Sequence, residues 1–518
     1  MTAVAPAPPR PRMGSRDAAL AGLAAGVLAL GIAEMVSALT GPSSQPLVAV
    51  GDAFVDATPP WLKDAAIRAF GTNDKQVLLT GAALVLAGLA ALAGLLAARR
   101  RVYGQWLVLA IGGVGVLAAA TRPDATVLSA LPSLTAAVVG SVVLSSLVDR
   151  LGVPAPEPTG APAPGRRLLL RTAGVVAGSG AVAFAAGRLL SERARDAEAS
   201  RDAVRLPAPA DPAPPLPAGV EVGVAGVVPF TVPTADFYRI DTALIVPRVR
   251  AEDWRLRIHG MVDREVTLDF ATLLGSPLVE RDVTLACVSN EVGGDLVGNA
   301  RWLGLPLGPL LRRAGLRPDA DMVLSTSADG FTCSTPLAAL TDGRDAMLAV
   351  GMNGQPLPVE HGFPVRMVVP GLYGYVSATK WVTDLEVTRF DRAQAYWTPR
   401  GWAERAPVKT QSRIDVPRAG QLLPAGRAAV AGVAWAQHVG IDRVEVRVDD
   451  GPWQAARLAA EASVDTWRQW VFTWDAAPGQ HVLQVRAIDR QGRAQTGDKA
   501  PVTPDGATGW HTVTVEVR

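Results

Sequence analysis

Cysteine and histidine are scarce in this sequence, and their scarcity excludes several classes of protein. Only two cysteines, Cys287 and Cys333, occur in 518 residues. Two are too few for a disulfide scaffold, a cysteine-ligated zinc module or an all-cysteine iron–sulfur cluster. All five histidines lie after residue 258. The first half of the chain therefore lacks the ligands of a bis-histidine haem, and we predict no haem.

Other common signatures are missing as well. The sequence contains no phosphate-binding loop, no Gly-x-Ser-x-Gly elbow, no His-Glu-x-x-His and no Cys-x-x-Cys. Its 50 basic and 48 acidic side chains give a net charge of +2, so we expect no nucleic-acid partner. The mean hydropathy of +0.21 is too high for an ordinary soluble enzyme. These values indicate a membrane protein with a large soluble part.

Long apolar stretches are concentrated in residues 1–190. They cover about 18–40, 76–98, 105–121, 125–148 and 172–190. Each approaches the roughly 20 residues that an α-helix needs to cross a bilayer. The sequence therefore predicts an α-helical membrane domain of about five transmembrane helices, in contact with membrane lipid.

Lysine and arginine residues predict the orientation of this domain. If the N-terminus is cytoplasmic, the inner segments carry Arg10, Arg12, Arg16, Arg99, Arg100, Arg101, Arg150, Arg166, Arg167 and Arg171. The outer segments then hold only Lys63, Arg68, Lys75 and Arg122. We therefore predict a multi-pass plasma-membrane protein with a cytoplasmic N-terminus, whose C-terminal part lies on the extracytoplasmic side.

Two features of the membrane domain each have two interpretations. Glu34, near the outer end of the first helix, either contacts a proton or quinone or is an ordinary carboxylate at the interface. Arg166 and Arg167 precede a weakly hydrophobic stretch that ends near residue 190, as in a twin-arginine export signal. They satisfy the positive-inside pattern equally well. The residues alone do not decide either question.

The soluble part divides into a linker and two domains. Residues 191–220 are rich in proline and alanine, which predicts an extended linker and not a packed element. In residues 221–405, short β-like runs such as 283–288 alternate with helical pieces such as 305–314, which predicts an α+β domain.

Residues 406–518 have a different pattern. Val444, Val446 and Val448 alternate with charged residues before an Asp450-Gly451 turn signal, and similar alternation recurs near the C-terminus. We predict an antiparallel, immunoglobulin-like β-sandwich here.

Cys287 ends an apolar run and is followed by a loop rich in glycine and asparagine. It is a buried small hydrophobe, a disulfide partner of Cys333, or a thiolate ligand of a metal whose other ligands come from an organic cofactor. In the third case Arg239, Arg366 and Lys380 would bind the cofactor's phosphate, the arginines through their fork geometry and the lysine as a point charge.

Five segments in this order, TLACVSN, GNARWLGLPL, AVGMNGQPLP, EHGFPVRMVVPG and SATKW, make residues 225–518 resemble the sulfite-oxidase family of molybdenum enzymes. The resemblance implies a sulfite-oxidase-like molybdopterin domain followed by a dimerisation-type sandwich, and hence a homodimer formed through the C-terminal domain. The membrane domain lies outside the resemblance and looks like that of a membrane-anchored bacterial branch.

The resemblance also implies roles for individual residues. Cys287 would be the catalytic residue that supplies the protein thiolate to molybdenum. The other implied cofactor-binding residues are Tyr238, Arg239, Asp241, His361, Arg366 and Lys380. Each of the last three also has a purely structural interpretation: His361 as a satisfied core histidine, Arg366 as a buried salt-bridge partner, and Lys380 as a solvated charge.

Departures from the family pattern bear on the substrate. Val350 stands where sulfite oxidases carry a tyrosine, and Asp241 stands where they carry a histidine. Residues 435–440 lack the arginine that helps those enzymes bind sulfite. Sulfite is therefore a poor candidate substrate, because a small dianion needs paired donors. Tyr373 or Tyr375 is a candidate replacement for the missing tyrosine.

We therefore expect a membrane-anchored, molybdopterin-dependent oxidoreductase that performs oxo transfer on a small S-, N- or oxyanion substrate. Its electron partner would be a quinone or an exported cytochrome. The alternative is a catalytically inactive, membrane-tethered binding or assembly protein that has kept the fold.

Overall fold

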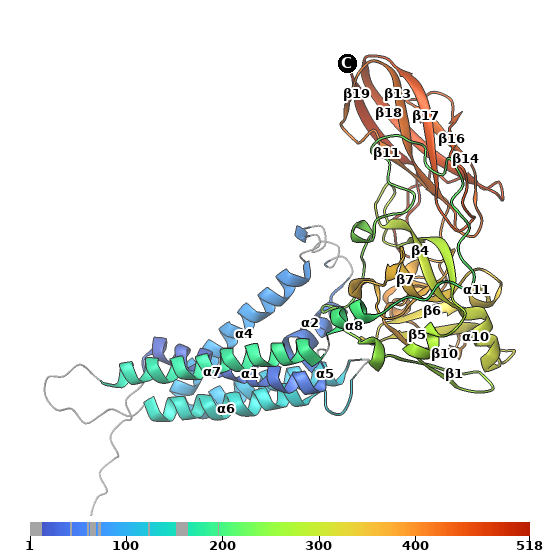
Figure 1. Ribbon diagram of the computed structural model, residues 1–518. Coiled ribbons are helices and arrows are strands. Elements are labelled where there is room, and N and C mark those ends of the chain that lie inside the picture. Colours follow the sequence, from blue (N-terminus) through green and yellow to red (C-terminus); the bar gives the residue numbers. More distant parts are fainter. Residues whose placement is uncertain are drawn as a thin grey trace, which may run out of the picture. The chain divides into compact units, whose positions relative to one another are not determined.

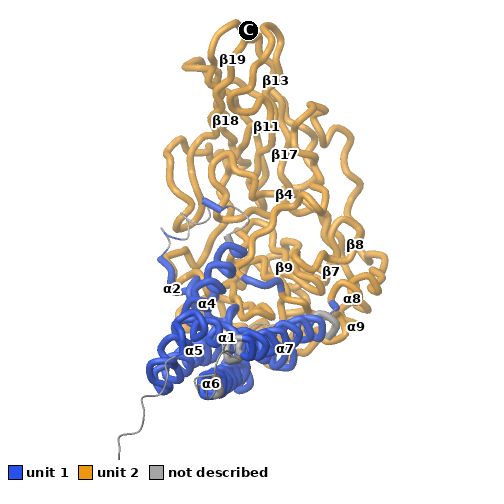
Figure 2. The backbone as a smooth tube through the Cα atoms, turned by 90° about the vertical axis from the view of Figure 1, so that its left-hand side faces the viewer, with its two compact units in different colours: residues 1–196, 243–246 blue, residues 197–242, 247–518 orange. Residues whose placement is uncertain are grey.

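A computed structural model describes residues 13–518 except 42–43, 60–61, 63–68, 71–73, 123–124, 152–163 and 195. The chain forms two compact units, which Figure 2 distinguishes by colour. Unit 1 comprises residues up to Asp196 with Ala243–Val246, and unit 2 comprises Ala197–Thr242 with Pro247–Arg518. Of the basic residues that predict the orientation, Arg10, Arg12, Lys63 and Arg68 and the side chains of Arg150 and Arg166 lie outside the described part.

Unit 1 is helical (Figure 1). Its helices are α1 (Ser15–Thr40), α2 (Pro46–Ala57), α4 (Asp74–Arg99), α5 (Arg101–Ala120), α6 (Leu131–Leu151) and α7 (Pro164–Ala194). All but α2 contain a stretch long and apolar enough to cross a membrane, in agreement with the five predicted from the sequence. Helix α2 was not predicted, because its 12 residues are too few to form a spanning run.

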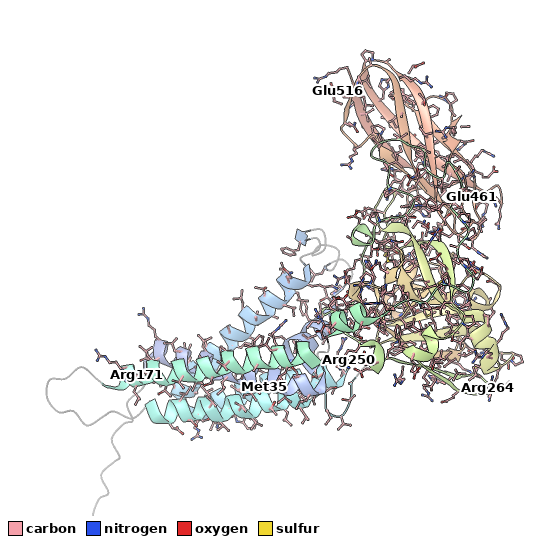
Figure 3. All side chains as sticks on the ribbon, in the orientation of Figure 1. Met35, Arg171, Arg250, Arg264, Glu461 and Glu516 are labelled. Carbon is pink, nitrogen blue, oxygen red and sulfur yellow. The ribbon has the colours of Figure 1, made fainter. Side chains whose placement is uncertain are left out.

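Small residues bring the helices of unit 1 into backbone contact. A Cβ atom added at Gly22 of α1 would lie 2.1 Å from the carbonyl oxygen of Ala90 of α4, and one added at Gly31 would lie 2.1 Å from that of Gly180 of α7. Residues early in α1 thus meet residues late in α4, while α1 and α7 run in the same direction. Figure 3 shows Arg171 at one end of the helices and Met35 farther along.

An apolar cavity of about 830 Å³ lies among α1, α2, α4, α5 and α6. Helix α4 packs closely on α1 near Ala90 but diverges from the other helices toward its start (Figure 1). A Cβ atom added at Gly81, which lines the cavity, would meet no atom within 4 Å. Glu34 follows the lining residue Leu30 by one helical turn, and it is buried and accepts a hydrogen bond from Gln45 Nε2 at 2.9 Å.

The first part of unit 2 contains two sheets. One has the strand order β2-β1-β10-β5-β6. Its strands are β1 (Arg255–Gly260), β2 (Val266–Asp269), β5 (Met322–Ser327), β6 (Thr332–Pro336) and β10 (Val382–Thr388). The other has the order β3-β4-β7-β8, with β9 paired to β7. Its strands are β3 (Val279–Ala286), β4 (Val297–Pro306), β7 (Met347–Met352), β8 (Gln355–Pro356) and β9 (Arg366–Val368).

Short helices accompany these sheets: α8 (Ala197–Ala203), α9 (Phe270–Leu274), α10 (Leu307–Ala314) and α11 (Leu337–Thr341). The mixture of helices and sheets agrees with the predicted α+β character. The apolar run before Cys287 forms the second half of β3, whose last four residues are all buried. Ala286 pairs with Val297 of β4, so the ladder ends immediately before the cysteine.

The C-terminal part of unit 2 is all-β. One sheet consists of β11 (Gln411–Val416), β13 (Gly426–Trp435), β17 (Arg468–Ala476) and β16 (Arg457–Leu458). The other consists of β12 (Leu422–Leu423), β19 (His511–Val517), β18 (Gly479–Asp489), β14 (Ile441–Val448) and β15 (Gln454–Ala455). Val444, Val446 and Val485 lie in a common core, as their alternation with polar residues predicts. The pairing is not wholly antiparallel, because β12 is parallel to β19. The immunoglobulin-like assignment stays a prediction.

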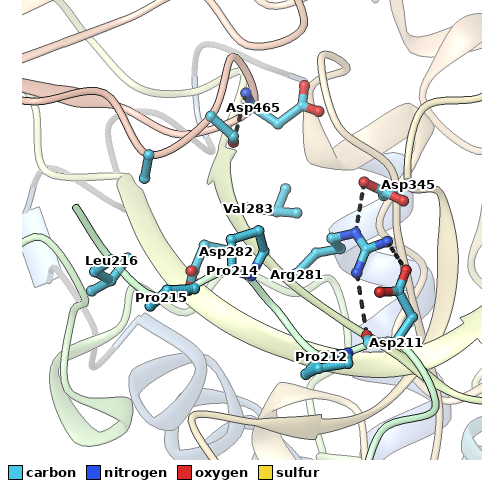
Figure 4. Close-up of a pocket in the computed structure, with 12 residues that line it drawn as sticks. Asp211, Pro212, Pro214, Pro215, Leu216, Arg281, Asp282, Val283, Asp345 and Asp465 are labelled. Carbon is cyan, nitrogen blue, oxygen red and sulfur yellow. Dashed lines mark hydrogen bonds and ion pairs between the residues drawn. The ribbon is translucent and has the colours of Figure 1, made fainter.

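Part of the predicted linker is packed, so the prediction of an unpacked segment is wrong there. The backbone N–H of Ala210 donates to Leu278 O at 2.8 Å, and that of Glu280 donates to Asp211 O at 2.9 Å. The abundance of proline hides this pairing in the sequence, because proline has no N–H to donate. The segment lines a pocket of about 270 Å³, in which Arg281 pairs with Asp211 and Asp345 (Figure 4). No residue predicted to bind the cofactor lines this pocket.

Candidate active site

Cys287 is a buried, free thiol at the end of β3. Its side chain is 9% exposed, and its Sγ accepts one hydrogen bond, from Ser289 N at 3.4 Å. Burial raises the pKa of this thiol, and the hydrogen bond from Ser289 partly opposes the rise. Cys333 is also free and completely buried, on β6. The predicted alternative of a Cys287–Cys333 disulfide is therefore wrong.

Four of the predicted cofactor residues form a positively charged cluster with Asp241. Asp241 Oδ2 accepts from Lys380 Nζ at 3.1 Å and from Arg239 Nε at 3.0 Å. Arg366 lies behind them with its guanidinium 5.1 Å from the Trp302 ring. It donates to His361 O at 3.1 Å, and within the described residues it has no carboxylate partner. The cluster therefore carries more positive than negative charge.

The pKa values of this cluster reflect burial and mutual repulsion. Burial, followed by the charges of Arg366 and Lys380, lowers the pKa of His361 to about 3, so its ring is neutral at physiological pH. Burial also lowers the pKa of Lys380 to about 8, although Asp241 opposes the shift. Arg366 has its pKa lowered by burial to about 10 and stays charged at neutral pH. An anion placed here would relieve the repulsion.

These contacts decide two of the structural alternatives. Lys380 is 11% exposed and hydrogen-bonded, so it is not a solvated charge. Arg366 is bonded to backbone carbonyls, so it is not a salt-bridge partner in the described structure. For His361, buried against Phe237 with ring centroids 5.8 Å apart, both interpretations stay open.

Tyr238 connects this cluster electrostatically with Cys287. Burial raises the pKa of the Tyr238 hydroxyl, the charge of Cys287 raises it further, and Arg366 opposes both effects. The preceding residue, Phe237, was missed in the sequence. Its ring stacks on Tyr238 with centroids 5.1 Å apart and meets Trp302 edge-on. Phe237 packs against Gly298, where a Cβ atom would lie only 2.8 Å from the ring. The sequence signal that could have identified Phe237 is its position as an aromatic residue immediately before Tyr238 and Arg239.

The described residues contain no group of three or more histidine, cysteine, aspartate or glutamate side chains able to hold a metal ion. A metal at Cys287 would therefore need most of its ligands from elsewhere. A single thiolate, linked through Tyr238 to a positively charged cluster, suits a metal carried by an anionic organic cofactor, because the thiolate can bind the metal and the cations can bind the anionic group.

A loop after β9 approaches Cys287 from another side. A Cβ atom added at Gly374 would lie 3.8 Å from Ala286 O, so the loop backbone passes beside the end of β3. Tyr373 and Tyr375 flank this glycine. Val350 is buried in β7. Gln437, in the sandwich segment where family members carry an arginine, donates from Nε2 to Thr284 O at 3.1 Å.

Comparison with known proteins also points to an oxidoreductase that binds molybdopterin. Residues 243–397 match the family described as "Oxidoreductase molybdopterin binding domain". Human mitochondrial sulfite oxidase is 29% identical over 308 residues, which cover 50% of this chain and 56% of that protein. The oxidoreductase YuiH of Bacillus subtilis is 31% identical over 152 residues, which cover 29% of this chain and 73% of that protein.

Among solved structures, the sulfane dehydrogenase SoxCD from Paracoccus pantotrophus has 25% sequence identity and a TM-score of 0.48, covering 56% of this chain and 82% of that one. The chain spans just over half the length of the human enzyme it matches. The matched domain and the similarity to YuiH are sufficient to assign the family. This chain belongs to the sulfite-oxidase family of molybdopterin-binding oxidoreductases.

Proposed function

We propose that this protein is a membrane-anchored oxidoreductase that performs oxo transfer on a small S-, N- or oxyanion substrate. The observation that carries the proposal is the position of Cys287. Its buried thiol lies at a strand end, within electrostatic reach of Tyr238, and Tyr238 is in turn influenced by Arg366 of the cationic cluster. The thiol and the net-positive cluster thus share the neighbour Tyr238, an arrangement that suits a metal carried by an anionic cofactor.

Different residues would bind different parts of the cofactor. When bound, the molybdenum cofactor supplies a metal that exchanges an oxygen atom and two electrons with a substrate. Cys287 would hold the metal. Arg239, Arg366 and Lys380 would hold the cofactor's phosphate, while Asp241 orients two of these cations through its hydrogen bonds.

His361 and Tyr238 would contact the organic part of the cofactor. The low pKa of His361 keeps its ring neutral, so it can both donate and accept a hydrogen bond. The aromatic group of Phe237, Tyr238 and Trp302 would exclude water beside the cofactor, which strengthens the charged interactions there.

The five apolar helices of unit 1 support the proposal of a membrane anchor. We further propose a cytoplasmic N-terminus with the catalytic domain on the extracytoplasmic side, and a homodimer formed through the sandwich. For the electron partner, the apolar cavity among α1, α2, α4, α5 and α6 favours a quinone over an exported cytochrome. An isoprenoid tail fits an apolar cavity of this size, and the Glu34–Gln45 pair near one end offers hydrogen bonds to a quinone ring.

The alternative function is an inactive binding protein that kept the fold. The presence in one chain of Cys287, the cation cluster and its aromatic wall argues against it. Turnover of a small S-oxide by the purified chain, with reduced viologen as the electron donor, tests the proposal. Cys287→Ser should abolish turnover, whereas Cys333→Ser, at the other buried thiol, should retain it. Equal turnover in both variants would contradict a catalytic role for Cys287.

A further inference from the structure

The loop beside Cys287 carries two tyrosines, and the structure distinguishes between them. Tyr375 is partly exposed, and its hydroxyl donates to Ala403 O at 2.7 Å, so its proton is already used. Tyr373 is 4% exposed. Its neighbour Gly374 passes beside Ala286, the residue before Cys287. Burial raises the pKa of the Tyr373 phenol and the charge of Cys287 raises it further, so the phenol lies within electrostatic reach of the thiol.

The hydroxyl of Tyr373 has an unused proton. It accepts a long hydrogen bond from Lys409 N at 3.5 Å, and within the described residues it donates to no acceptor. Gly506 permits its position, because a Cβ atom there would lie 2.6 Å from the hydroxyl oxygen. A buried hydroxyl without an acceptor costs free energy unless a ligand supplies one. The Tyr373 hydroxyl can therefore donate a hydrogen bond to an acceptor atom of a substrate.

Two cations beside this loop, Arg344 and Lys409, are each paired with a carboxylate. His438 and Arg344 lie beside the loop at Gly371. A Cβ atom added at Gly371 would lie 2.9 Å from His438 Cβ and 3.1 Å from Arg344 Nη1. Two ion pairs flank the loop, Arg344 with Asp342 at 2.6 Å and Lys409 with Asp505 at 2.8 Å, and His438 Nδ1 is hydrogen-bonded to Asp465 Oδ1 at 3.1 Å. Neither of these two cations is left unpaired to balance the charge of a bound anion.

Gln437 is a neutral residue and adds no positive charge beside this loop. Its backbone oxygen would lie 3.3 Å from a Cβ atom at Gly371, so it belongs to the same neighbourhood. It is 3% exposed, and its side-chain Oε1 has no hydrogen-bond partner in the described structure. A buried amide oxygen repels an anion, whereas an arginine at this position would attract one.

From these observations we propose that Tyr373 is the residue that donates a hydrogen bond to the oxygen atom of the substrate, and that the site takes a neutral S- or N-oxide in preference to an oxyanion. The inference rests on the proposed function and narrows its substrate class. The reaction with a sulfoxide is balanced: the sulfoxide, two electrons and two protons give the sulfide and one water as the S–O bond breaks. An added donor such as reduced viologen supplies the electrons. Tyr373 keeps its proton throughout and positions the oxide.

The test uses the full chain, purified from a host that makes molybdopterin and analysed for molybdenum. Dimethyl sulfoxide with reduced methyl viologen is the neutral substrate, and sulfite with ferricyanide is the anionic one. Tyr373→Phe should lower kcat/KM for dimethyl sulfoxide about tenfold to a hundredfold, because it removes one donor to the reacting oxygen. Tyr375→Phe is the matched control and should change it by less than about twofold, since that hydroxyl is bonded to Ala403.

A second measurement does not depend on turnover. Dimethyl sulfone and sulfate are unreactive neutral and dianionic probes, and titration calorimetry gives the Kd of each. We expect the sulfone to bind more tightly than sulfate, and Tyr373→Phe to weaken the sulfone about tenfold. Tighter binding of sulfate, or identical behaviour of the two tyrosine variants in a molybdenum-loaded chain, would overturn this inference alone. A folded chain without molybdenum would overturn the proposed function, and the inference with it.

Discussion

Lys380 Nζ lies 3.1 Å from Asp241 Oδ2, and the two side chains are only 11% and 5% exposed. Asp241 also accepts a hydrogen bond from Arg239, so one carboxylate serves two cations in a cluster that contains Arg366 as well. The family resemblance places a histidine at this position. In the proposed site, the carboxylate would hold the cations together before the cofactor binds and would leave enough positive charge to attract a phosphate.

Asp241→Asn should destabilise the chain without cofactor by about 3 kcal/mol, because it leaves the Lys380 charge buried and unpaired. In the loaded chain the loss should be smaller, since a phosphate supplies negative charge. Urea denaturation of both forms measures the two values. Asp384→Asn is the control: its partner His259 is 21% exposed, so the cost should stay below about 1 kcal/mol. Equal losses in the loaded and unloaded chains would contradict a role for Asp241 beside the phosphate.

The lowered pKa of Lys380 predicts how cofactor retention depends on pH. Its pKa falls from the ordinary 10.5 to about 8, chiefly through burial. The unfolded chain therefore binds more protons between these values, and the stability of the unloaded chain should rise with pH across this window. Phosphate binding needs the ammonium form, so cofactor affinity should fall above pH 8 by up to about tenfold per unit. Molybdenum retained after dialysis at stepped pH measures this, and Lys380→Arg should abolish the dependence. A flat profile in the unaltered chain would exclude the phosphate role.

The sequence was sufficient to predict features that depend on local pattern. Five long helices follow from apolar runs, because a bilayer-spanning helix must be long and apolar. The strand before Cys287 follows in the same way from its apolar residues. The sequence names Arg239, Arg366 and Lys380 as candidate phosphate ligands but cannot show that they meet, because Arg239 lies 127 residues before Arg366.

Features that depend on tertiary contacts were not predictable. Nothing in the sequence pairs Asp241 with Lys380 across 139 residues, or joins Asp211 to β3. The choice between Tyr373 and Tyr375 also needed the structure, because it depends on which hydroxyl has an acceptor nearby. Helix α2 was missed because it is short, although it contributes to the cavity of unit 1.

The helix directions predict the membrane topology. Reporter domains fused after residues 70, 102, 123, 160 and 200 should appear outside, inside, outside, inside and outside the cytoplasm, because five spans separate the N-terminus from the soluble part. Paired reporters that are active on opposite sides of the membrane provide the measurement. A cytoplasmic signal after residue 200 would contradict the proposed location of the catalytic domain.

Gly81→Leu tests the quinone proposal. Gly81 lines the apolar cavity with open space beside it, so a leucine would fill volume that an isoprenoid tail needs. The quinone extracted from the purified full chain should fall about tenfold. Gly88 lies on the same helix with equal open space but does not line the cavity, so Gly88→Leu should retain the quinone. Phospholipid without quinone in the unaltered chain would show that the cavity holds only membrane lipid.

The most direct test of the central claim is the molybdenum and pterin content of the full chain, purified from a host that synthesises molybdopterin. The proposed site predicts about one molybdenum per chain, held by the single thiolate of Cys287. Cys287→Ser should lose the metal while staying folded, and Cys333→Ser should keep it, because Cys333 lies in the core on β6. A folded chain without molybdenum or pterin, or a Cys287→Ser variant that retains both in full, would contradict the account.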